Sequence, residues 1–327
     1  MSEIQPFLSF CIFSFNQEKY IKEAIEGALK QTFNAMEIII SDDCSTDNTY
    51  NIVKETIDEY NGSHKVIINQ NTRNKGVVEH LNYVVNNLVN SNIIIVNAGD
   101  DISYPERTSI IKSYFDKNPD VYAICSNADM INHMGKKTGR LFKNKDTFDL
   151  KPRNFIDAWT KGLQVFGAAA AYKKEVFDRF RPLDSTIRNE DFILPFRASL
   201  LGKIGYIADP LIKYREHGKN MSYWVKMKNT TSIKEFKKLQ LANLANKLAN
   251  LQHFKKDIEL NNDIKTFNYL NKVNRKIESY CLKIELLNYN FYKRILAIIR
   301  HWRGLSKNNF LIFLFPNLYI KWLMKKQ

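Results

Sequence analysis

The first half of the chain alternates short runs of β-branched and aromatic residues with longer segments of helical periodicity. This alternation is typical of βαβ units, in which helices connect the strands of a mostly parallel sheet. The candidate strands are Leu8 to Phe13, Glu37 to Ser41, Lys65 to Asn69, Ile93 to Asn97 and Val121 to Ser126. We therefore expect an α/β fold.

Helices are expected between these strands, because apolar residues recur there at helical spacing. The segments are Glu18 to Lys30, Asn48 to Tyr60 and Val77 to Leu88. Thr46 or Asp47 is expected to cap the second helix, since a short oxygen-bearing side chain accepts free N–H groups of a first turn. Beyond Ser126 the pattern predicts a hairpin-like excursion at 127–137, a helix at 153–161, a strand at 165–172, a helix at 190–200 and a strand at 211–214.

The net positive charge of the chain lies in its last third. Residues up to Lys219 hold equal numbers of basic and acidic residues, whereas those from Asn220 onward hold 21 Lys and Arg against 6 Asp and Glu, which accounts for the whole net charge of +15. From Thr231 to Arg303 there is no Gly or Pro, and apolar residues recur at helical spacing. We expect a domain at 1–220 and a basic, mainly helical region at 221–327.

Several classes of protein lack their sequence signals here. The four cysteines are widely spaced and form no C-x-x-C pair, which predicts neither a zinc site nor a disulfide framework. We expect no signal peptide and no membrane span, because no apolar run reaches about 18 residues, so a cytoplasmic location is expected. The motifs G-x-G-x-x-G, G-x-x-x-x-G-K-[ST], H-E-x-x-H and G-x-S-x-G are also absent from the sequence.

Four polar clusters follow the first four predicted strands. They are Ser14 to Glu18, Ser41 to Asp47, Asn71 to Val77 and Asn97 to Asp101. Ligands of open α/β sheets bind outside the carboxyl ends of the strands. The sequence therefore predicts a binding site built from these four loops.

The same segments resemble family 2 glycosyltransferases of the GT-A fold, a Rossmann-like sheet flanked by helices. The resemblance is carried by SFNQEKYIKEAIEGALKQTFNAMEIIISDDCSTDNT, by AGDDISYPER in the D-x-D region, by RNEDFILPFRASLLGKIGYI in the E-D region and by YREHGKNMS in the terminal Y-R-x-H region. It spans about residues 6–222. The basic region lies outside it.

The resemblance implies a binding site for a nucleotide-diphosphate sugar. Asp43 matches the carboxylate that accepts the uracil N3–H, and Arg73, Asn74 and Gly76 match the loop near the ribose and diphosphate. The complete donor-binding set predicted in this way is Phe13, Ser14, Phe15, Asn16, Glu18, Asp43, Arg73, Asn74, Gly76, Gly99 and Asp101. Arg73 could equally be a solvated loop cation.

The resemblance also implies a divalent metal, Mn²⁺ or Mg²⁺, at Asp100, because hard oxygen ligands suit these ions. His217 is the candidate second ligand, with a purely structural role as its alternative. Ala98 replaces the first aspartate of D-x-D, so the ribose contact of that residue is not expected here. The other histidines, His64, His80, His133, His253 and His301, are expected to be surface or packing residues.

Asp191 is the expected general base of an inverting transfer, and Glu190 is the second candidate. Such a base deprotonates the acceptor hydroxyl while it attacks from the face opposite the diphosphate. Adjacent residues of a helix point about 100° apart, so only one of the two can face the acceptor. The alternative for Asp191 is a cap of the helix that follows, and for Asp42–Asp43 and Asp100–Asp101 it is a capping or turn role.

The basic region has two interpretations. Tyr292, Ile295, Ile299 and Trp302 share a helical face flanked by Lys293, Arg294, Arg300 and Arg303, as in a helix at an anionic membrane surface. The apolar run Phe310 to Phe315 follows. The alternative is that these apolar residues pack against the catalytic domain or a second subunit, as in a homo-oligomer.

We therefore expect a glycosyltransferase at the inner face of the cell membrane. Its donor is expected to be a UDP-sugar rather than a dTDP- or GDP-sugar. Its acceptor is expected to be a hydroxyl of a lipid-linked or polysaccharide glycan of the cell surface, such as O-antigen or capsule. The rival hypothesis is a nucleic-acid-binding protein with a nucleotide-binding scaffold and a basic tail. It is disfavoured because the positive charge is spread along helices and forms no recognisable nucleic-acid-binding module.

Overall fold

The computed structural model describes residues 7–142, 165–184, 187, 190–217, 232–261, 264–300, 312, 320, 321 and 324. The helix expected at 153–161 and Trp302 lie outside the described residues, as does the run 310–315 apart from Ile312. The chain divides into two compact units, Met1–His217 and Gly218–Gln327, which are described separately.

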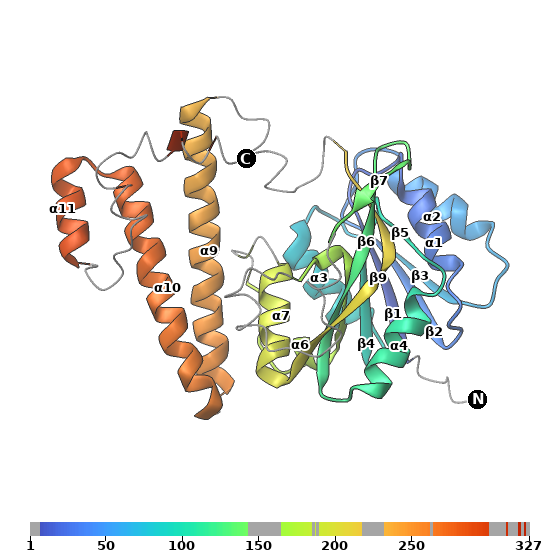
Figure 1. Cartoon of the computed structure of the whole chain (residues 1–327). Helices are drawn as coiled ribbons and strands as arrows, with labels where there is room; N and C mark the ends of the chain where they lie inside the picture. The colour runs from blue at the N-terminus through green and yellow to red at the C-terminus, as the bar shows by residue number, and fades with distance from the viewer. Residues whose placement is uncertain are drawn as a thin grey trace. The chain divides into compact units, whose positions relative to one another are not determined.

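One sheet of nine strands forms the centre of the first unit in the described part of the chain (Figure 1). Its order is β3-β2-β1-β4-β8-β6-β9-β5, with β7 paired to β6. The strands are β1 (Leu8–Ser14), β2 (Met36–Asp42), β3 (Lys65–Gln70), β4 (Ile93–Ala98), β5 (Ile102–Ser103), β6 (Val121–Ile131), β7 (Lys137–Arg140), β8 (Ala170–Lys173) and β9 (Lys203–Arg215). The α/β fold predicted from the sequence is confirmed.

The register of the first four strands brings their carboxyl ends to one edge. The pairs β1–β2, β1–β4 and β2–β3 are all parallel. Ser14 pairs with Asp42, Asp42 with Gln70 and Phe13 with Ala98. The four polar loops therefore emerge side by side, as the sequence predicted.

Helices cover both faces of this sheet (Figure 1). They are α1 (Ile21–Leu29), α2 (Thr49–Asp58), α3 (Gly76–Asn87), α4 (Arg107–Lys117), α6 (Glu175–Asp178) and α7 (Glu190–Leu201). Ile21, Ile25 and Ala28 of α1 pack into one apolar cluster with Val53 of α2 and Ile111 of α4. These three helices therefore share a face of the sheet, and α3, α6 and α7 lie on the other (Figure 1).

The second half of the sheet departs from the parallel pattern. Strand β8 runs antiparallel between β4 and β6, and β5 and β7 are antiparallel to their neighbours as well. The strand expected at 165–172 is instead a 3-10 turn, η2 (Gly167–Ala169), followed by β8. The excursion expected at 127–137 is the end of β6 and a turn to β7, with Gly135 at φ 77°.

The second unit contains α9 (Ile233–Asn261), α10 (Ile264–Asn288) and α11 (Phe291–Arg300), so the predicted helical extension is present (Figure 1). Its apolar cluster contains residues from all three helices, together with two residues that follow them in the sequence. The residues of the helices are Phe236, Leu282, Leu286, Leu287 and Ala297, and the two others are Ile312 and Ile320. Among the described helices, none combines the length and apolar character that a membrane crossing requires.

Candidate functional site

Asn16 connects the loops after β1 and β2 through hydrogen bonds. Its backbone N–H donates to Ser45 Oγ at 2.8 Å, and its Oδ1 accepts the N–H of Thr46 at 2.8 Å. Asn16 has φ 53°, a left-handed conformation that asparagine tolerates better than most residues. The turn after β2 is closed by Asp42, whose Oδ2 accepts the N–H of Ser45 at 2.8 Å.

Glu18 and Asp47 form further hydrogen bonds that connect these loops to the start of α2. Glu18 Oε2 accepts the N–H of Asn48 at 3.1 Å, and Asp47 Oδ2 accepts the N–H of Glu18 at 3.3 Å. Asp47 Oδ1 accepts the N–H of Thr49, the first residue of α2, at 3.0 Å. Of the two caps expected from the sequence, Asp47 rather than Thr46 has this role. Glu18 therefore holds the polar loops in place.

Asp43 organises the loop that follows β3. Its Oδ1 accepts Asn71 Nδ2 at 2.8 Å and the N–H of Lys75 at 2.9 Å, while Oδ2 accepts the N–H of Gly76 at 2.8 Å. Gly76 has φ 73°, which a residue with a side chain rarely adopts. This buried carboxylate thus fixes the backbone of the third loop against the ends of β1 and β2.

Aromatic and hydroxyl side chains adjoin Asp43. The half-buried ring of Phe13 meets His80 of α3 edge to face, with centroids 5.2 Å apart. Ser14 Oγ donates to Asp42 Oδ1 at 3.2 Å, whereas Phe15 is 44% exposed. The structure therefore brings Phe13 and Ser14 into the cluster and leaves Phe15 at the surface.

His80 was not assigned to the site by sequence reasoning. It is buried, and its Nε2 lies 2.6 Å from Ser41 Oγ. Burial lowers the pKa of His80, although the nearby carboxylates of Asp43 and Asp42 act in the opposite direction. The signal available in the sequence was its position four residues after Gly76, on the same face of the helix as the polar loop.

Arg73 and Asn74 lie on the outer side of the third loop. Arg73 is largely exposed and forms an ion pair with Glu79. Asn74 Oδ1 accepts the N–H of Gly76 at 3.0 Å. Asn74 thus supports the glycine conformation, while the Arg73 guanidinium projects from the loop rim.

Gly99 allows the fourth loop to approach the first. A Cβ atom at Gly99 would lie 2.3 Å from Gln17 Oε1 and 3.1 Å from Ser14 Cβ. The backbone N–H of Gly99 donates to the carbonyl oxygen of Phe13 at 2.9 Å. A side chain at this position would therefore displace the Gln17 side chain and press on Ser14.

Asp100 and His217 form a close pair. Asp100 Oδ2 lies 2.8 Å from His217 Nε2, and both side chains are 12% exposed. Two ligands that each lie about 2.1 Å from an octahedral ion are about 3 Å apart, so these two atoms fit one Mn²⁺ or Mg²⁺. Among the described residues no group of three or more His, Cys, Asp or Glu side chains could hold a metal. The described part of the chain thus offers two candidate ligands at this position.

Asp101 faces the interior. It is fully buried, and its Oδ1 accepts the N–H of Arg215 at 2.9 Å. Burial, reinforced by the Asp100 carboxylate, raises the pKa of Asp101 well above its usual value. The sequence predicted a donor contact for Asp101, but the structure gives this side chain no exposed surface and connects it to Arg215.

Arg215 and Tyr20 surround the Asp100–His217 pair, and sequence reasoning gave neither a role. Arg215 Nε donates to the carbonyl oxygen of Asp100 at 3.0 Å, and its terminal nitrogen pairs with Glu23 at 2.9 Å. The Tyr20 ring stacks on the His217 imidazole with centroids 5.0 Å apart. Both residues belong to the quoted motifs, but their contacts join segments that are almost 200 residues apart.

Glu190 and Asp191 open helix α7 beside the η2 turn. A Cβ atom at Gly167 would lie 2.9 Å from Asp191 Cβ and 3.6 Å from Glu190 Oε1, so only glycine fits between them. Burial and then the neighbouring Glu190 raise the pKa of Asp191 to about 8. Burial also raises the pKa of Glu190. Asp191 Oδ1 has no hydrogen-bond partner among the described residues.

Arg107 connects the Asp100 loop to the segment beside Asp191. Its guanidinium donates to Asn97 Oδ1 at 2.9 Å and to the carbonyl oxygen of Ala168 at 3.2 Å. Asn97 Nδ2 in turn donates to the carbonyl oxygen of Asp101 at 3.1 Å. The predicted metal-binding loop and the turn that packs on Asp191 thus share one hydrogen-bonded network.

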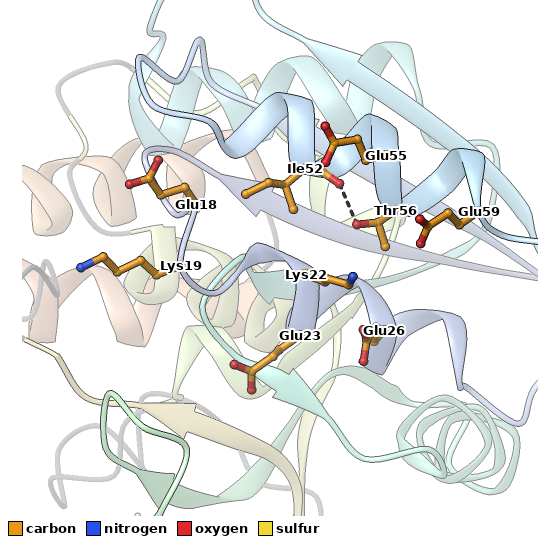
Figure 2. Close-up of a pocket in the computed structure, with 9 residues that line it drawn as sticks. All are labelled: Glu18, Lys19, Lys22, Glu23, Glu26, Ile52, Glu55, Thr56 and Glu59. Atoms are coloured by element: carbon orange, nitrogen blue, oxygen red, sulfur yellow. Dashed lines mark hydrogen bonds between the residues drawn. The ribbon is translucent and has the colours of Figure 1, made fainter.

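A separate open pocket of about 420 Å³ lies between α1 and α2 (Figure 2). Its lining is mostly charged and consists of Glu18, Lys19, Lys22, Glu23, Glu26, Ile52, Glu55, Thr56 and Glu59. Asp43, Asp100 and Asp191 do not contribute to it. This pocket therefore adjoins the cluster at the carboxyl ends of the strands through Glu18 but contains none of those three aspartates.

Comparisons with known proteins agree with this arrangement. A family model described as Glycosyl transferase family 2 matches residues 9–181, more than half of the chain. A protein of Haemophilus influenzae named as an uncharacterised glycosyltransferase is 26% identical over 253 residues, which cover 74% of this chain and 76% of that protein.

Solved structures share the fold at low sequence identity. The structure of S. aureus TarS 1–349 in complex with UDP-GlcNAc has a TM-score of 0.57 at 13% identity, covering 98% of this chain and 91% of that TarS 1–349 chain. The mannosyltransferase PcManGT of Pyrobaculum calidifontis in complex with GDP-Man and Mn²⁺ has a TM-score of 0.53 at 15% identity, covering 98% and 86%. The chain thus has the expected GT-A fold.

Proposed function

The chain belongs to glycosyl transferase family 2 and is a glycosyltransferase, and from this premise we propose that it moves a sugar from a nucleotide-diphosphate donor to an acceptor hydroxyl with inversion. The observation that carries the proposal is the alignment of the carboxyl ends of β1 to β4. This alignment gathers Asp43, Asp100 and their loops at one sheet edge, where open α/β sheets bind ligands.

The donor in this proposal is a UDP-sugar whose base lies near Asp43. Each carboxylate oxygen has two acceptor sites, so the three hydrogen bonds from the protein leave room for one from the uracil N3–H. The ring of Phe13 and the rim of the third loop, with Arg73 and Asn74, adjoin the same region. TarS in complex with UDP-GlcNAc is a structural neighbour and supports the choice of a uridine donor.

Asp100 and His217 would hold the divalent cation in this proposal. When bound, Mn²⁺ or Mg²⁺ supplies positive charge that stabilises the departing diphosphate. The imidazole favours Mn²⁺, because Mg²⁺ prefers oxygen ligands. The structure of PcManGT is a complex with GDP-Man and Mn²⁺, which supports a divalent metal in this proposal.

Asp191 would accept the proton of the attacking hydroxyl. Its raised pKa makes the carboxylate a stronger base than an exposed aspartate, and Glu190 beside it contributes to that shift. The alternative role for Asp191 is a cap of helix α7. Glu190 remains the second candidate for the same role.

The acceptor in this proposal is a surface glycan carried on a lipid, and the enzyme contacts the anionic inner face of the membrane through its C-terminal unit. On α11, Ala297 and Ile298 pack inward, whereas Tyr292, Leu296 and Ile299 are 79%, 60% and 67% exposed. Such an exposed apolar stripe in a strongly basic segment suits an anionic lipid surface. One alternative is that a second copy of the chain covers this stripe.

Donor binding is tested by thermal unfolding with UDP, GDP or dTDP, each with and without Mn²⁺. A ligand that binds only the folded state raises the melting temperature. We expect the largest rise with UDP and Mn²⁺ together, and a loss of the Mn²⁺-dependent part in Asp100→Ala. Equal melting temperatures under all conditions would contradict the proposed donor site.

The membrane contact is tested by flotation of the full chain with vesicles that contain anionic lipid. We expect binding that weakens at high salt and that is lost in the double variant Leu296→Glu, Ile299→Glu. Light scattering of the wild type and of the same double variant measures the oligomeric state and so tests the alternative. Loss of a dimer without a change in flotation would favour a second copy of the chain over the membrane. A salt-sensitive gel shift with DNA or RNA in place of flotation would instead favour the nucleic-acid hypothesis.

A further inference from the structure

Tyr20 lies between two side chains of the Arg215–His217 segment. The Arg215 guanidinium carbon is 4.7 Å from the centre of the Tyr20 ring. The His217 imidazole stacks on the same ring, with centroids 5.0 Å apart and an interplanar angle of 28°. The ring of Tyr20 is therefore an internal contact surface for the last described residues of the first unit.

The backbone of Tyr20 is itself held in place. Its N–H donates to the carbonyl oxygen of Gln17 at 2.9 Å, which forms a tight turn between β1 and α1. The N–H of Gln17 donates to Thr49 Oγ1 at 2.7 Å, which ties this turn to the start of α2. One turn further along α1, Glu23 pairs with the buried Arg215. The turn that carries the Tyr20 ring is thus held between the starts of α1 and α2.

An imidazole binds a metal well only when its ring orientation is fixed, and the groups that fix it contribute strongly to affinity. His217 needs such fixation because its Nε2 must lie beside Asp100 Oδ2, which it approaches to 2.8 Å. Stacking on an aromatic ring restricts the tilt of the imidazole and keeps Nε2 at the edge of the ring, beside Asp100 Oδ2.

We propose that Tyr20 is a positioning residue that fixes the imidazole of His217 beside Asp100, so that both donor atoms are presented together to a divalent cation. The inference rests on the proposed function, because it takes Asp100 and His217 as the pair that holds the metal. It adds a residue of the β1–α1 turn, more than 190 positions away in the sequence, to the determinants of metal affinity.

The test measures Mn²⁺ affinity directly, by the electron paramagnetic resonance signal of free Mn²⁺ during titration of the full chain in the presence of UDP. Tyr20→Leu removes the planar face, and we expect it to weaken Mn²⁺ binding about 10- to 100-fold, the range typical of groups that support a metal ligand. Tyr20→Phe keeps the ring and should bind Mn²⁺ nearly as tightly as the wild type.

Two controls make the result specific. Tyr50→Leu removes a partly buried tyrosine of α2 that packs on the apolar cluster, and it should leave Mn²⁺ affinity unchanged. His217→Ala should weaken Mn²⁺ binding at least as much as Tyr20→Leu.

In a turnover assay with a UDP-sugar, Tyr20→Leu should raise the Mn²⁺ concentration for half-maximal rate more than it lowers the maximal rate. Should Tyr20→Leu fail to fold, Tyr20→Met fills similar volume without a planar face and serves in its place.

The outcomes separate this inference from the proposal beneath it. Wild-type affinity in Tyr20→Leu together with weak binding in His217→Ala would overturn the role of Tyr20 alone. Equal weakening in Tyr20→Phe and Tyr20→Leu would overturn it as well, because the stacked ring would not be the feature that matters. Unchanged affinity in His217→Ala would instead overturn the metal pair of the proposed function.

Discussion

Arg107 is fully buried and donates a hydrogen bond of 2.9 Å to Asn97 Oδ1, which joins the Asp100 loop to the η2 turn beside Asp191. Removing a buried donor leaves its buried acceptors without hydrogen-bond partners, at a cost of about 1–3 kcal/mol for each such group. We expect Arg107→Met to lower the free energy of unfolding in urea by an amount of this order and to reduce activity. The exposed Lys117→Met in the last turn of the same helix is the matched control and should stay within about 0.5 kcal/mol of wild type. Equal stability of the two variants would show that the network is not a structural connection.

Asp191 should make both stability and activity depend on pH. Its pKa is raised from 3.8 to about 8 in the folded protein, so folding favours the protonated form. The stabilisation is fully present below pH 3.8 and is lost as the pH rises through about 8, with a slope of at most about 1.4 kcal/mol per pH unit. Asp191→Asn lacks this loss and should become more stable relative to wild type as the pH rises from 4 to 8.

The same titration should appear in catalysis. Only the carboxylate accepts a proton, so kcat/KM of the wild type should rise with pH up to about 8. Asp191→Asn should have little activity at any pH, and Glu190→Gln is the comparison that identifies which carboxyl group is the base. A stability difference that does not change between pH 4 and 8 would contradict the raised pKa.

The strands of the first half could be predicted from the sequence because their side chains carry the signal themselves. Ile38, Ile39 and Ile40 are buried on both faces of a central strand, and such a run has few alternatives to a parallel strand. By contrast, the turn at Gly167 follows from the antiparallel insertion of β8 between β4 and β6. That pairing joins segments far apart in the sequence, so no local pattern indicates it.

The site divides in the same way. Asp43 and Asp100 follow predicted strands, so their common edge could be inferred, and the register of β1 with β2 and β4 agrees. The buried state of Asp101 could not be inferred, because it depends on the approach of Arg215 from β9. His80 and Tyr20 have roles that arise only from tertiary contacts with Phe13 and His217.

A side chain at Gly99 should disturb the packing of the first and fourth loops. A Cβ atom there would collide with Gln17 Oε1 at 2.3 Å and press on Ser14 Cβ at 3.1 Å, so Gly99→Ala should lower the free energy of unfolding by about 1–3 kcal/mol. Gly139→Ala is the matched control, because no atom lies within 4 Å of its added Cβ. The double variant Gly99→Ala, Gln17→Ala should recover part of the loss. Thermal or urea unfolding measures all three, and a Gly99→Ala protein as stable as the control would refute the close packing of the two loops.

Asp43 should control both the order of the third loop and the binding of uridine nucleotides. Asp43→Ala removes the acceptor for the N–H groups of Lys75 and Gly76 and for Asn71 Nδ2, and a buried donor left without a partner costs about 1–3 kcal/mol. We expect faster hydrogen exchange at the amides of Lys75 and Gly76, together with loss of UDP binding in calorimetry. Asp116→Ala on the surface of α4 is the control and should change neither. Faster exchange with unchanged UDP affinity would leave Asp43 a structural residue of the loop and exclude it from recognition of the base.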